Sequence, residues 1–133
     1  MLLLTPDVQL AVLTAGGVNE ARADWSQQGR DNLTREIESQ LKPKGHGFKV
    51  ADPSRLMAGR VGQVLRLHQA VGQSILSLPL PTKKAGFDWT LGDGSQSLAQ
   101  TEGAEYALFV HANGNYASGG RMATAIGLSL VGV

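Results

Sequence analysis

The sequence predicts a single α/β (α+β) domain in which helices pack on a mixed β-sheet, and three observations lead to that prediction. Strand-like apolar segments alternate with amphipathic helical ones, in the order β-α-β-α-(α)-β-β. The 133 residues suit one domain, because a chain of this size buries about two thirds of its unfolded surface. No internal repeat or low-complexity tract interrupts the pattern. We therefore expect residues 1–133 to form one domain with two long helices and one short helix.

The first expected strand is interrupted close to its beginning. Leu2–Leu4 and Val8–Leu13 are both apolar, and they lie on either side of Pro6. Proline has no backbone N–H to donate to a ladder, so it marks an edge, a bulge or the start of a strand. We expect the strand to break there.

The first long helix follows a loop after that strand. It is expected to begin at Asp24 or Ser26, since either side chain can accept a hydrogen bond from a free amide of the first turn. Apolar residues at four-residue steps then give one buried stripe as far as about Leu41. Gly47–Ala51 is the next expected strand.

The second long helix is expected from Pro53 to about Leu78, with Asp52 as its N-cap. Its apolar residues keep helical spacing throughout. The short helix is expected at Ser95–Glu102, and Gly103 suits the left-handed position that ends many helices.

The carboxy-terminal part contains the strongest strand candidate. Tyr106–Val110 is almost entirely apolar, which suits a strand covered on both faces, and we expect it to be central in the sheet. A sharp turn is expected after it, because Asn and Gly tolerate positive φ angles and this stretch is rich in both: Asn113, Gly114, Asn115, Gly119 and Gly120.

Two interpretations of Met122–Val133 remain open. The large side chains fall on even positions and the small ones mostly on odd positions, and this period of two favours a strand. The alternative is a helix that opens at Gly120, for which Ala and Leu are good formers.

Composition excludes several classes of function. Twelve basic and eleven acidic side chains give a net charge of +1, and their interspersed order predicts no nucleic-acid-binding face. There is no cysteine, and the three histidines lack ligand spacing, so we expect no metal and no cofactor. The chain begins and ends in apolar segments, which leads us to expect a fragment of a longer chain. Membrane attachment is then expected only through a lipid anchor outside this fragment.

The densest polar cluster follows the strand candidate and is the candidate ligand-binding site. Loops after buried strands often carry functional residues, although Asn, Gly and Ser also have purely local uses in turns. The spacing from Gly114 to Gly119 matches a phosphate-binding loop, but Gly120 and Arg121 stand where that loop needs Lys and Ser or Thr. His111 could act as a base, but no serine nucleophile elbow or paired carboxylate lies near it in sequence, and we assign no catalytic residue. The candidate residues are His111, Asn113, Asn115, Tyr116, Ser118 and Arg121.

Four segments resemble a known group of proteins. LLLTPDV, TAGGVNEARADW, FDWTLG and GAEYALFVHANGNYASGGR, in this order, resemble uncharacterised bacterial envelope lipoprotein-like proteins. That group is similar to the curli-secretion lipoprotein and to the amino-terminal domain of the Tol-system propeller protein. The resemblance implies a mixed sheet with flanking helices, a location in the periplasm or at the outer membrane, and action by assembly. It supplies no active site, and this chain lacks the lipid-attachment cysteine of such proteins.

The leading hypothesis is a non-enzymatic cell-envelope domain that associates with other proteins. Its expected partner is a second copy or another envelope protein, which would add to an exposed strand edge. The residues expected to carry self-association are Leu128, Leu130 and Val133, because they are too apolar to face water. The alternative is a small-ligand or nucleotide-binding enzyme that uses the glycine-rich loop Asn113–Arg121. A deep polar pocket at that loop would favour the enzyme, and a flat apolar surface would favour association.

Overall fold

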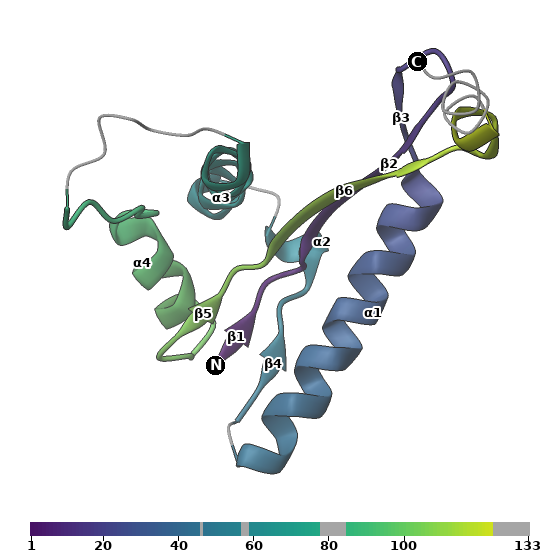
Figure 1. The fold of residues 1–133 in the computed structure, drawn as a ribbon. Helices are drawn as coiled ribbons and strands as arrows, with labels where there is room; N and C mark the ends of the chain where they lie inside the picture. The colour runs from purple at the N-terminus through teal and green to yellow at the C-terminus, as the bar shows by residue number, and fades with distance from the viewer. Residues whose placement is uncertain (46, 57–58, 78–84, 124–133) are drawn as a thin grey trace.

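A computed structural model describes residues 1–45, 47–56, 59–77 and 85–123. These residues form two small sheets of three strands each and four α-helices that pack around them, which confirms the predicted α/β class (Figure 1). One sheet has the strand order β4-β1-β5, and the other has the order β3-β2-β6. The two sheets are joined because β1 leads directly into β2, and β5 leads directly into β6.

These two joined strand pairs run parallel to each other, and both are interrupted at the same level. β1 (Leu2–Leu3) pairs with β5 (Ala107–Leu108), and β2 (Asp7–Leu13) pairs with β6 (His111–Ala117). Residues 4–6 separate β1 from β2, whereas only residues 109–110 separate β5 from β6. The first chain therefore contains one extra residue, as in a β-bulge, and this confirms the break predicted at Pro6.

The most deeply buried strand is β1, in the middle of the first sheet. It pairs in parallel with β4 (Lys49–Val50) on one side and with β5 on the other. Leu2, Leu3 and Leu4 are completely inaccessible to solvent. The apolar core around them adds residues from α3, α4 and the end of β4: Ala51, Val64 and Leu98.

The prediction that Tyr106–Val110 is the central strand was wrong. Only Ala107 and Leu108 are in β5, which lies at an edge of its sheet, and Tyr106 is 69% exposed. The segment 106–110 buries less apolar surface than its sequence suggests, because the aromatic residue at its start faces water. Three consecutive leucines offer more aliphatic surface for burial, and they occupy the middle position instead.

In the second sheet, β2 lies between β3 and β6. It is antiparallel to β3 (Asn19–Ala21) and parallel to all seven residues of β6. The helix α1 (Ala23–Leu41) covers the face that carries Val8 and Leu10, where Gly29 lets the helix approach: a Cβ at Gly29 would lie 2.9 Å from Val8 Cγ1. Figure 1 shows α1 along one side of this ribbon of strands and α3 on the other.

The helix α1 has nearly the predicted bounds, but its cap differs. Arg22 occupies the N-cap position, and Asp24 lies in the first turn, where it pairs with Arg22. Ser26 is used otherwise: its hydroxyl donates to the Arg22 carbonyl (2.8 Å) and accepts from the Leu10 N–H (2.9 Å). Ser26 thus fastens the start of α1 to β2.

The predicted second long helix is divided. α2 (Pro53–Leu56) is a single turn, and α3 (Gly59–Ser77) is the long part. Gly59 has a φ of +67°, a left-handed conformation that cannot continue a right-handed helix. The prediction of one continuous helix from Pro53 was therefore wrong. Asp52 does cap the start, because its carboxylate accepts from the Ser54 N–H at 2.9 Å.

The short helix α4 (Asp93–Thr101) ends as predicted at Gly103, which has a φ of +71°. The Gly103 N–H donates to the Gln100 carbonyl (3.0 Å), and the Ala104 N–H donates to the Ala99 carbonyl (2.8 Å). This pair of bonds is the Schellman arrangement.

The sharp turn predicted at Asn113–Gly120 does not form. The chain continues as β6 to Ala117, because seven residues in parallel register with β2 outweigh the turn preference of Asn and Gly. Residues 119–123 are helical, and the Met122 N–H donates to the Ser118 carbonyl at 3.0 Å. At Met122 the structure therefore supports the helical alternative over the strand. The remainder of that segment, including Leu128, Leu130 and Val133, lies outside the described residues.

The lengths and compositions of the helices also bear on membrane insertion. Within the described ranges, no helix combines the length and the apolar character that crossing a bilayer needs.

Candidate functional site

A carboxylate and an imidazole pair at the point where the two sheets join. Asp7 is the first residue of β2 and His111 is the first residue of β6, and the two are register partners. His111 Nδ1 lies 2.7 Å from Asp7 Oδ2, and the two side chains are only 5% and 12% exposed. The parallel register brings together two residues that are 104 positions apart in the sequence.

The His111 ring is held against α3. A Cβ added at Gly72 would lie 2.5 Å from His111 Cγ, so only glycine lets the helix come this close. The His68 ring, also on α3, meets the His111 ring edge to face with centroids 6.2 Å apart. Among the described residues, His111 Nε2 is buried and has no hydrogen-bond partner. A buried acceptor or donor without a partner is uncommon in folded proteins.

His68 is the second histidine of this cluster and is 7% exposed. Burial lowers the pKa of His68 below its ordinary value, and the neighbouring His111 lowers it further, while the negative charge of Asp7 acts in the opposite direction. Its ring also packs on Phe109, with centroids 5.1 Å apart. His68 is therefore held mainly in the neutral form at neutral pH.

Two hollows border His68. One, of about 330 Å³, lies between α3, residues 89–91 and Phe109, and both histidines line it. The other, of about 480 Å³, lies at the strand break beside Thr5 and Pro6, and Arg30 and Arg66 contribute to its wall. Among the described residues, the lining of the first is apolar apart from the histidines and Thr90, and the lining of the second includes the charged side chains of Asp7, Arg30 and Arg66.

The structure brings three of the six predicted site residues onto one face of β6. His111, Asn113 and Asn115 alternate along the strand on the side that faces α3. The Asn113 amide donates to Gln73 Oε1 of α3 at 3.1 Å. Asn113 and Asn115 are exposed, and they line a polar surface hollow with side chains of β2, β3 and α3.

The other three predicted residues lie elsewhere. Tyr116 points to the opposite face, where its ring meets Trp25 of α1 edge to face at 5.8 Å. The Ser118 hydroxyl accepts from the Arg121 N–H at 3.1 Å and caps the helical residues 119–123. The Arg121 guanidinium donates to the Thr14 carbonyl at 3.5 Å. Each of these contacts has a local structural use.

Sequence reasoning missed Asp7 and did not group His68 with His111. The missing carboxylate lies at the opposite end of the described chain, and only the strand register connects it to His111. A polar residue that directly follows the Pro6 break, between apolar segments, was the one available signal.

The chemistry of this cluster is that of an oriented imidazole. A carboxylate at Nδ1 holds the proton on that nitrogen and leaves Nε2 as an acceptor. Asp7 and His111 thus have the geometry of a general base and the group that orients it. In the part of the chain that the structure describes, no group of three or more His, Cys, Asp or Glu side chains could hold a metal ion.

Comparison with known proteins adds no relative to this picture: no protein-family model, no curated protein and no solved structure matches the chain.

Proposed function

We propose that this domain works by protein association, and that its interface is the outer edge of β6, which pairs with β6 of a second copy. The observation that carries the proposal is that β6 is a long edge strand without protection. It contains seven residues, HANGNYA, with no Lys, Arg, Asp, Glu or Pro among them. Natural proteins usually place charges or proline on such edges to prevent pairing with other chains.

The other edges of the described sheets contrast with β6. β3 has three residues with Glu20 at its centre, and β4 and β5 have two residues each. Lys49 of β4 additionally pairs with Glu102 at 3.0 Å. Short and charged edges are poor templates for strand addition. β6 alone among the described strands combines an edge position with length and lack of charge.

The backbone groups of β6 are oriented for this pairing. The Asp7 N–H donates to the Val110 carbonyl, and the Ser118 N–H donates to the Leu13 carbonyl, so these two bonds fix the phase of the ladder with β2. Alternation in a parallel ladder then directs the backbone N–H and C=O of odd-numbered residues away from β2. The residues whose backbone groups point away from β2 are His111, Asn113, Asn115 and Ala117.

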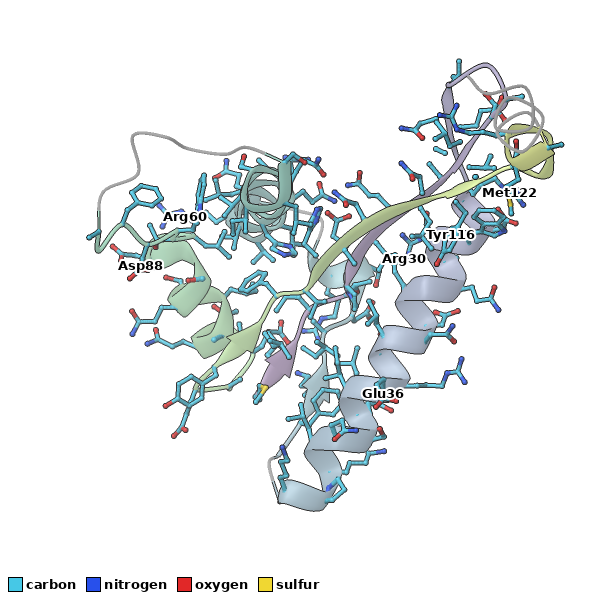
Figure 2. All side chains as sticks on the ribbon, in the orientation of Figure 1. Arg30, Glu36, Arg60, Asp88, Tyr116 and Met122 are labelled. Carbon is cyan, nitrogen blue, oxygen red and sulfur yellow. The ribbon has the colours of Figure 1, made fainter. Side chains whose placement is uncertain are left out.

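A second copy suits this edge better than a charged partner does. A two-fold axis through Asn115 would pair Asn115 with its own copy and Asn113 with Ala117 of the other, with no like charges opposed. Apolar surface continues beyond the edge, because Tyr116 is 62% exposed and Met122 is 56% exposed. Figure 2 shows both side chains at the far end of β6, near the first turns of α1. They would extend the interface beyond backbone hydrogen bonds.

The cellular location is part of the same proposal. The sequence resemblance to envelope lipoprotein-like proteins supports a periplasmic or outer-membrane location. In that location the domain would act by binding another protein chain, without catalysis. Fractionation of cells that produce the native open reading frame tests this location. Recovery of the protein in the cytoplasmic fraction would contradict it without bearing on the interface.

The interface is tested by measuring molar mass with light scattering as protein concentration rises. The wild type is expected to form a dimer in the micromolar range. Asn115→Lys would oppose two positive charges across the axis and is expected to raise the dimer dissociation constant at least tenfold. Asn19→Lys is the matched control, because it adds the same charge to the same face of the opposite edge strand.

Two results would contradict the proposal. A wild type that remains monomeric at high micromolar concentration shows that the edge does not self-pair. Equal weakening by Asn115→Lys and Asn19→Lys shows that net charge, and not the β6 edge, controls association. Circular dichroism of each variant excludes unfolding as the cause of a change.

A further inference from the structure

The hollow beside His111 has the features of a small-molecule site, and it involves the His111 side chain and not the backbone edge of β6 proposed for pairing. We propose that the hollow of about 330 Å³ between α3, residues 89–91 and Phe109 binds a small apolar molecule that carries one hydrogen-bond donor, received by His111 Nε2. Its volume falls at the lower end of the range of ligand pockets.

The described lining favours an uncharged apolar ligand. The apolar side chains are contributed by three separate segments, and no Asp, Glu, Lys or Arg is among the lining residues that the structure describes. Ile75 and Leu76, which line the hollow, are 52% and 57% exposed, so a ligand can cover apolar surface that is otherwise in water. Burial of apolar area therefore supplies the affinity. The apolar lining consists of Val71, Ile75, Leu76, Trp89, Leu91 and Phe109.

His111 selects a donor. Its side chain is only 5% exposed, and Asp7 Oδ2 accepts a hydrogen bond from Nδ1–H at 2.7 Å. Nε2 is thereby left as an acceptor, with no partner among the described residues. An acceptor buried in this way gains from any ligand that brings an O–H or N–H to it. His68, packed against the same ring, is the second polar group at the hollow.

Two isomeric probes separate the donor from apolar burial. Hexan-1-ol and 1-methoxypentane have the same formula and nearly the same apolar area, but only the alcohol can donate. Trp89 lines the hollow, so its fluorescence reports binding once Trp25 is replaced by Phe. We expect a saturable change in Trp89 emission with hexan-1-ol, and binding of the ether about five- to tenfold weaker.

The variant His111→Leu removes the acceptor and keeps an apolar wall. We expect it to abolish the preference for the alcohol, so that the two probes bind alike. Tyr116→Leu is the matched control on the opposite face of β6 and should leave both affinities unchanged. Equal binding of the two probes to the unsubstituted hollow would overturn the proposal, and so would absence of a saturable signal up to the solubility limit. Both of these results are read without any substitution at His111, so they hold even if His111→Leu fails to fold.

Discussion

At the scale of single residues, the contact between Gly72 and His111 determines how α3 meets the sheet. Glycine in a helix interior lowers helix stability by about 1 kcal/mol relative to Ala, so a glycine here needs a reason. The reason is the imidazole, which occupies the space that a Cβ would need. Asp7 in turn fixes that imidazole. One hydrogen bond and one missing methyl group therefore set how closely α3, a helix of 19 residues, approaches β6 at this point.

Gly72→Ala tests this contact through the sign of its effect. In an open helix the substitution would stabilise the protein, but here the added methyl overlaps the His111 ring, and we expect a loss of about 1–3 kcal/mol in the free energy of unfolding. Urea titration measures this loss. In a His111→Ala background the same substitution should become neutral or stabilising. A stabilising Gly72→Ala in the wild type would show that the ring does not fill this space.

His68 predicts a dependence of stability on pH. Because its pKa is lowered in the folded protein, the unfolded chain binds the proton more readily, and stability falls as pH drops below about 6.5. The titratable and charged groups near it are Asp7 and His111 on the strands, and Arg30 and Arg66 beside the strand-break hollow. Asp24 and Asp52 also have lowered pKa values, but they act at more acidic pH, below the ordinary Asp value of 3.8.

The measurement compares urea midpoints of wild type and His68→Phe between pH 7.5 and 5.5. The wild type should lose stability over this range, and the variant should lose less, because every other titrating group is common to both. Parallel curves for the two proteins would show that His68 does not contribute.

At the scale of elements, the sequence predicted most helices and strands, but it did not predict which strand is central or how far β6 extends. The break at Pro6, the Asp52 cap and the Gly103 terminator depend on local backbone chemistry, and local chemistry can be read from neighbouring residues. The central position of β1 and the extension of β6 through Asn113 and Gly114 depend on pairing between distant segments. The candidate site shows the same division. His111 was identified from its place after a strand, whereas Asp7 was not, because its role exists only in the register.

The greater contribution of β1 than of β5 to stability is tested by truncating two leucines that are register partners. Leu3 is completely buried and pairs with Leu108, which is only half-buried. Leu3→Ala is expected to reduce the free energy of unfolding by about 2–5 kcal/mol. Leu108→Ala is the matched control in the neighbouring strand and should cost distinctly less. Equal losses of unfolding free energy in the two variants would show that β5 contributes as much to the core as β1 does.

At the scale of the whole molecule, the two sheets are expected to unfold together. Both strand pairs pass from one sheet into the other, and the Asp7 N–H bond to the Val110 carbonyl (2.9 Å) holds them at the junction. Trp25 packs beside β6 in the second sheet, and Trp89 lies beside α3. Each tryptophan therefore reports on a different part of the molecule.

Single-tryptophan variants, Trp25→Phe and Trp89→Phe, test this cooperativity. The urea transition of each variant followed by its remaining tryptophan should coincide with its own transition followed by circular dichroism. Separate transitions in either variant would mean that the junction does not couple the sheets.

The parallel ladder between β2 and β6 also has a consequence during protein synthesis. A ribosome makes β2 long before it makes β6, since Asp7 and His111 are 104 positions apart. Until β6 emerges, the nascent chain presents β2 with the whole edge that β6 will later cover. Pairings over such long separations form slowly, and strands that wait for them are open to aggregation. Slower translation of residues 14–110 would lengthen this interval, so the yield of folded protein should depend on elongation rate and on chaperones that shield extended segments.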